Sequence, residues 1–141
     1  MGDITANISQ YELDCTCGEC NVTIDSREPV IQLVQDCGDR LRALHKATNL
    51  TIKITSAARC YSYNRLQPTD DHPEYPGSND NSQHPRSRAI DFKIILDGIQ
   101  VPPREVYEDL VQSLPTKCGI GLYRTFTHLD SRPWCARWSM V

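Results

Sequence analysis

The chain has no surplus of basic residues, no long apolar run and no internal repeat. Its formal net charge is −3 over 141 residues, which argues against nucleic acid as a partner because phosphates must be neutralised by cations. No apolar stretch approaches the length of a membrane span. With neither a low-complexity tract nor a convincing linker, a chain of this length suits one globular domain with a hydrophobic core.

The N-terminus also lacks the pattern of a secretion signal, in which basic residues precede an apolar stretch. We therefore expect synthesis in the cytoplasm.

Cysteine, by contrast, is abundant, with seven in the chain. An odd number cannot pair completely within one chain, and the cytosol disfavours disulfides. We expect a mixture of metal-binding, buried and free thiols.

Hydrophobic periodicity predicts two helices and several strands. A helix begins at Pro29 and runs to about Ala47, with Asn49 ending it; its apolar stripe is Val30, Val34, Cys37, Leu41 and Leu44. A second helix begins at Pro102 and Pro103 and stops at Pro115, with an apolar stripe of Val106, Leu110, Val111 and Leu114.

Residues 51–57 and 88–96 read as strands, the latter closed by an Asp97-Gly98 turn. Residues 118–123 and 126–130 read as a hairpin or two short strands.

These elements predict an α+β fold of one domain, with a small, mostly antiparallel sheet and two main helices. Residues 1–25 form an N-terminal segment that contains "CTCGEC" and packs on the domain formed by residues 26–141. A polar loop of roughly residues 61–85 separates the first two strands. A loop of this length within a compact domain is usually functional.

The stretch "SQHPRSRAIDFKI" joins this loop to a strand and contains His84 and Asp91. In the strand, Asp91 lies on the face opposite the apolar Ile90 and Phe92. His84 can reach Asp91 only if the backbone turns between them. A catalytic zinc site needs three protein ligands and an open position, and His128 in "FTHLD" offers the third. A solvated loop histidine is the alternative interpretation of His84.

Four ordered motifs resemble the D-Ala-D-Ala carboxypeptidase-type zinc peptidases, which include cell-wall carboxypeptidases, phage endolysins and, distantly, the hedgehog signalling domain. The motifs are "SAARC" (56–60), "NSQHPRSRAIDF" (81–92), "GIGLY" (119–123) and "FTHLDSRPWCARW" (126–138). The family signature Ser-x-His-x-x-Gly-x-Ala-x-Asp matches at Ser82, His84, Ala89 and Asp91.

The resemblance implies a zinc ion bound by His84, Asp91 and His128 in a cleft covered by the long loop. It implies that Arg59 approaches the substrate and steadies its carbonyl oxygen in the transition state, and that Ser82 lines the same cleft. The implied reaction is hydrolysis of peptidoglycan stem-peptide bonds next to D-amino acids, by a carboxypeptidase or an endopeptidase. Zinc would polarise the scissile carbonyl and lower the pKa of water toward ~7.

The chain departs from the family pattern in two respects. The signature glycine is Ser87, which would be strained if the turn needs a positive φ. Relatives place a general base two or three residues before the last histidine, where this chain has Phe126 and Thr125. Asp130 is the nearest substitute: it takes a proton from the water nucleophile, or it orients a ligand.

Three functional hypotheses follow. The first is a peptidase that reaches the cell wall during phage lysis, or as a virion component with other phage structural proteins as partners. The second is a binding or structural module that keeps the zinc scaffold without catalysis. The third is a thiol-redox or cysteine-zinc protein built around Cys15, Cys17 and Cys20, for which Cys37 or Cys60 would supply a fourth ligand.

Overall fold

The computed structural model describes residues 2–17, 20–59, 83–84, 86–114 and 117–141. Its elements are the 3-10 helix η1 (Gln10–Leu13), α1 (Pro29–Leu44), β1 (Leu50–Ser56), β2 (Ala89–Leu96), β3 (Ile99–Gln100), α3 (Pro103–Ser113), β4 (Gly119–Leu122), β5 (Thr127–Asp130) and β6 (Ala136–Ser139). Apart from Gln83 and His84, the long loop predicted between the first two strands lies outside the described residues, as does Ser82.

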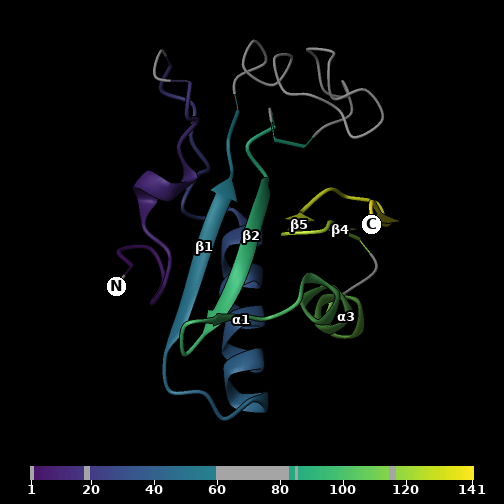
Figure 1. Ribbon diagram of the computed structural model, residues 1–141. Helices are drawn as coiled ribbons and strands as arrows, with labels where there is room; N and C mark the ends of the chain where they lie inside the picture. The colour runs from purple at the N-terminus through teal and green to yellow at the C-terminus, as the bar shows by residue number, and fades with distance from the viewer. Residues whose placement is uncertain (1, 18–19, 60–82, 85, 115–116) are drawn as a thin grey trace.

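One mixed sheet organises these elements. Its strand order is β1-β2-β5-β4-β6, with β3 paired to β2. Every pairing is antiparallel except that of β4 with β6. Figure 1 shows the long strands β1 and β2 lying across α1, with α3 beside the short strands. The predicted α+β fold with a mostly antiparallel sheet is confirmed; β6 was not predicted, because its pairing with β4 joins segments that no local pattern connects.

Helix α1 begins at Pro29, as predicted, but ends earlier than expected. Lys46 has a φ of 54°, and its amide donates to Ala43 while that of Ala47 donates to Arg42. These two bonds form a Schellman motif, which satisfies the last carbonyls of the helix. The predicted end at about Ala47 and Asn49 is therefore wrong by several residues, because a left-handed residue closes the helix first.

Four of the five residues in the predicted apolar stripe of α1 are buried, but only two of the four in the stripe of the second helix are. Val34 and Leu41 of α1 and Leu110 of α3 are buried in the core, whereas Leu44 is 72% exposed and Val111 is 42% exposed. Leu44 is the last residue of α1, where the chain turns away toward β1, and Val111 lies a helical step of about 100° from Leu110. Among the described residues, no helix combines the length and the apolar character that crossing a bilayer requires.

Strand β2 separates the core from the other face of the sheet. Ile90, Phe92 and Ile94 are fully buried, as their alternation predicts. The strand ends in the predicted turn, with φ of 48° at Asp97 and 83° at Gly98. Across this turn Leu96 pairs with Ile99. Positive φ at both central residues is the geometry of a tight hairpin turn.

The N-terminal segment contributes to the same core. Ile8, Leu13 and Ile24 are fully buried. The buried Gln35 of α1 holds the segment in place: its side-chain oxygen accepts from the Thr5 hydroxyl (2.7 Å) and from a backbone amide (3.0 Å). The segment is therefore packed against α1 by apolar burial and by a buried amide network. A boundary at residue 25 stays a prediction.

Candidate metal centre

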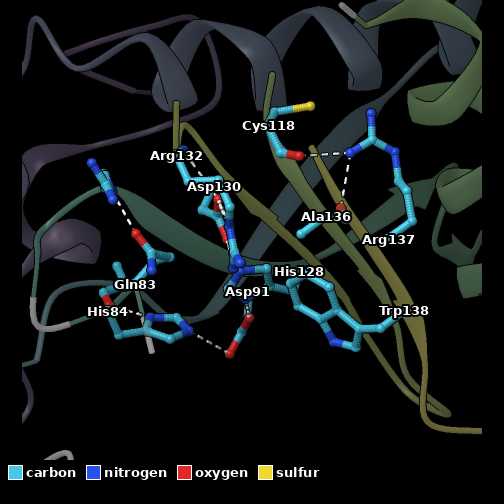
Figure 2. A network of polar contacts seen from close by, with 12 residues as sticks. Gln83, His84, Asp91, Cys118, His128, Asp130, Arg132, Ala136, Arg137 and Trp138 are labelled. Carbon is cyan, nitrogen blue, oxygen red and sulfur yellow. Dashed lines mark hydrogen bonds and ion pairs between the residues drawn. The ribbon is translucent and has the colours of Figure 1, made fainter. Parts of the chain in front are cut away.

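Neighbouring strands bring two of the three predicted metal ligands together. Asp91 on β2 and His128 on β5 are direct partners in the antiparallel register, so their side chains lie on the same face of the sheet. His84 joins them from the segment before β2 (Figure 2). The ligand atoms of the three residues all lie within 4.8 Å of one another. All three side chains are buried, with 4 to 6% of each residue exposed.

His84 reaches this position because the chain turns at Ser87. Ser87 has a φ of 56°, and its amide donates to the His84 carbonyl at 3.0 Å. The turn therefore does require a positive φ, and Ser87 is strained as expected, because an L-residue is sterically disfavoured in the left-handed region. The turn redirects the backbone so that the His84 ring faces Asp91.

Each histidine turns one ring nitrogen toward Asp91 and the other toward a second acceptor. His84 Nδ1 lies 2.5 Å from the Ala57 carbonyl, which can only accept, so Nδ1 carries the proton. His84 Nε2 then faces Asp91 Oδ2 at 3.2 Å. His128 Nε2 lies 2.7 Å from Asp130 Oδ2, and its Nδ1 lies 2.8 Å from Asp91 Oδ1. The nitrogens that face Asp91 are therefore Nε2 of His84 and Nδ1 of His128.

Asp130 lies across the His128 ring from Asp91 (Figure 2). Its carboxylate is fully buried and accepts from Arg132 Nε at 2.8 Å and Nη2 at 2.6 Å. This forked ion pair and the His128 bond use both carboxylate oxygens. Arg132 belongs to the motif "FTHLDSRPWCARW" (126–138). Its contact with Asp130 was not predicted, although the spacing of two residues between an arginine and an aspartate was a signal for it.

Charge and burial act in opposition at these groups. Burial works to raise the pKa of Asp91, but His84 and His128 outweigh it and hold that pKa well below its usual range. Burial works to lower the pKa of His128, yet its bonds to Asp130 and Asp91 raise the pKa to about 9. Asp130 also has a lowered pKa, because Arg132 and His128 outweigh its burial. The His128 imidazole thus lies between the ionised carboxylates of Asp91 and Asp130, and this arrangement favours a positive charge at that place.

The donor set fits zinc. Zinc binds imidazole nitrogen and carboxylate oxygen at about 2.0–2.2 Å, and catalytic sites use three protein ligands. Metal-bound histidines typically donate their second N–H to a carbonyl or a carboxylate, which fixes the ring. Ala57 does this for His84, and Asp130 does it for His128.

An open cleft of about 290 Å³ has Asp91 in its lining, whereas His84 and His128 do not line it. Arg59 lies in it: its Nη2 is 3.6 Å from Asp91 Oδ2, and its Nε donates to the Ser56 hydroxyl at 3.0 Å. The full lining is Thr16, Thr55, Ser56, Arg59, Asp91, Lys93, Thr125 and Phe126. The positions where relatives carry a general base, Thr125 and Phe126, therefore face the cleft. Lys93 and Thr16 were not predicted here.

The C-terminal strand completes the back of the site. Trp138 on β6 lies 5.0 Å from the His128 ring, measured between centroids, and its Nε1 donates to the Tyr123 hydroxyl at 2.9 Å. Gly121 on β4 makes room for it, since a Cβ there would lie 2.5 Å from the indole. Trp138 thus packs against one of the predicted metal ligands.

Comparison with protein families gives one match. The family described as Peptidase M15 matches residues 6–130, a range that contains His84, Asp91, His128 and Asp130. No curated protein and no solved structure matches the chain.

Replacing Ser87 by glycine is expected to stabilise the protein by about 0.5–1 kcal/mol, because glycine removes the cost of the left-handed conformation. Urea unfolding of the chelator-treated protein measures this without a contribution from bound metal. Ser113→Gly, in the exposed last turn of α3, is the matched control and should destabilise by about 0.5 kcal/mol. A loss of stability in Ser87→Gly would contradict the strain assigned to this turn.

Replacing His128 by alanine is expected to remove about one zinc ion per chain, because the remaining two ligands leave the ion poorly held. Mass spectrometry of the tag-free protein measures the zinc content. His45→Ala, at an exposed histidine that contacts Glu105, should leave the zinc content unchanged. Unaltered zinc in His128→Ala would remove the basis for a metal centre here.

Proposed function

Because the chain belongs to the peptidase M15 family, we propose that it is a zinc peptidase that hydrolyses peptidoglycan stem-peptide bonds next to D-amino acids. The observation that carries this proposal is the buried cluster of His84, Asp91 and His128, of which Asp91 also lines an open cleft. A carboxypeptidase and an endopeptidase share this chemistry, and the proposal covers both.

The three ligands have separate tasks in this proposal. His84 and His128 would bind through unprotonated ring nitrogens; for His128, whose pKa is raised to about 9, metal binding would release a proton. Asp91 would supply a charge that partly neutralises the metal. When bound, zinc supplies Lewis-acid chemistry that polarises a carbonyl and lowers the pKa of water. The Ala57 carbonyl and the Asp130 carboxylate hold the two rings in place, which avoids reorganisation during the reaction.

Arg59 is the proposed electrostatic stabiliser. Its guanidinium lies beside Asp91 in the cleft and stays protonated at all relevant pH values. A substrate carbonyl entering the cleft would meet this fixed positive charge as its oxygen becomes negative. Ser82, which lies outside the described residues, keeps its proposed role in binding the substrate.

For Asp130 we favour the orienting role over that of general base. Both of its oxygens are occupied by His128 and Arg132, and the His128 ring stands between it and Asp91. A base must come within hydrogen-bond reach of the proton that it removes, and this placement supports ring orientation instead. Asp130 is then a positioning residue.

The composition of the cleft favours one alternative, a zinc-holding binding or structural module without catalysis. Among the described residues that line the cleft, Asp91 is the one carboxylate, and it is a proposed ligand. Thr125 and Phe126 cannot act as a base. Chelator-sensitive hydrolysis of peptidoglycan distinguishes the two functions.

The biological setting is a further part of the proposal. The substrate is the peptide of the cell wall, reached during phage lysis or by delivery in a virion, where other phage structural proteins would be partners. The family supports peptidoglycan-type substrates, and the phage setting rests on the sequence resemblance alone.

The function is tested by the release of amino groups from purified peptidoglycan. We expect release by the zinc-loaded protein, loss with a chelator and recovery with added zinc. Arg59→Ala should lower kcat/KM by about 10²-fold or more, as for other removed transition-state donors. Arg42→Ala, at an exposed arginine of α1, should retain activity. Absence of hydrolysis by a fully zinc-loaded protein would favour the non-catalytic module.

Asp130→Asn separates the two roles of this residue. If Asp130 orients His128, zinc affinity should fall by about 10–100-fold, while kcat and its pH dependence at saturating zinc change little. If Asp130 were the general base, kcat would fall by about 10²–10⁴-fold at full zinc occupancy. Zinc titration and a pH–rate profile, on variants with native circular dichroism, measure both quantities.

A further inference from the structure

A second group of metal-binding side chains lies in the N-terminal segment, outside the proposed peptidase site. The sulfurs of Cys15, Cys17 and Cys20 lie within 4.8 Å of one another. Cys15 is buried, and the other two are half-buried. The proposed hydrolysis uses none of these thiols, so their convergence needs a separate explanation.

The sulfur separation fits metal ligands better than a disulfide. Cys17 Sγ and Cys20 Sγ are 3.5 Å apart, whereas a disulfide bond is about 2.05 Å long. Two thiolates at ~2.3 Å from a tetrahedral zinc ion lie about 3.8 Å apart. The spacing Cys-x-x-Cys from Cys17 to Cys20 is also the usual one for a zinc-binding turn.

The backbone holds both ends of this loop. The Cys15 amide donates to the Val22 carbonyl at 2.8 Å, and the Leu13 carbonyl accepts from Ala58 at 3.3 Å. Leu13 and Ile24, on either side of the loop, are fully buried. The thiols are therefore carried on a short loop closed at its base, which lowers the entropy lost when they gather around an ion.

We propose that Cys15, Cys17 and Cys20 bind a second zinc ion as thiolates, with water in the fourth position. Three thiolates and one open position satisfy the tetrahedral preference of zinc. Cys37, considered above as a fourth ligand, lies instead in the apolar core on α1, outside this group. Cys60 lies outside the described residues.

The position of the loop gives the ion a consequence for the peptidase cleft. Thr16 lies between two of the ligands and lines the cleft together with Arg59 and Asp91. An ion bound by the neighbouring thiolates fixes this wall of the cleft. The second zinc thus stands at the edge of the proposed substrate site.

The test is a count of zinc in the full-length, tag-free chain purified under reducing conditions. We expect about two zinc ions per chain, a loss of about one in Cys17→Ser/Cys20→Ser, and a loss of about one in His128→Ala. Cys135→Ser, at an exposed cysteine outside the cluster, is the matched control and should lose none. Zinc unchanged in the double cysteine variant would overturn the proposal.

Cobalt substitution provides a second measurement, which in the wild-type protein does not depend on whether the cysteine variants fold. Thiolate ligands give sulfur-to-cobalt charge-transfer absorption in the near ultraviolet, which His84, Asp91 and His128 cannot produce. Its presence, retained in His128→Ala, supports the cysteine site even if the protein proves to have no peptidase activity. Its absence, or an oxidised Cys17–Cys20 pair in the reduced preparation, would overturn the site and leave the peptidase proposal intact.

Discussion

The antiparallel register of β2 against β5 is the constraint on which the candidate metal centre depends. It sets Asp91 directly opposite His128, so that an acidic and an imidazole side chain share one face at close range. A slip of one residue would turn one of these side chains to the core face and bring its apolar neighbour to the site. The same alternation that buries Ile90 and Phe92 against α1 therefore also creates the polar pair, and the core and the site stabilise one register together.

The segment that follows β1 joins the remaining parts of the site. The Ala57 carbonyl holds the His84 ring, the Ala58 amide holds the N-terminal segment through Leu13, and the Arg59 amide donates to the His84 carbonyl. Three consecutive residues thus connect the proposed metal ligand His84, the cysteine loop and the cationic wall of the cleft. Because most of these contacts use backbone atoms, the arrangement depends on the path of the chain more than on the side chains at these positions.

Buried charge in this region is tolerated because each group has a partner. Asp91 lies between two histidines, and Asp130 lies between His128 and Arg132. An unpaired carboxylate at such depth would carry a desolvation cost of several kcal/mol. The series Arg132, Asp130, His128 and Asp91 therefore forms a connected network that fixes the His128 ring from both sides, and Trp138 packs against the same ring.

The sequence by itself determined the α+β class, the main helices and strands, the Asp97-Gly98 turn and which face of β2 carries Asp91, because these follow from periodicity and turn chemistry within short windows. It also supplied His84, Asp91 and His128 as candidate ligands. It did not determine β6 or the nitrogen that each histidine turns toward Asp91. Tertiary structure decided these, because they depend on a backbone carbonyl of a distant segment and on strands paired across the sheet, for which a local pattern of side chains carries no signal.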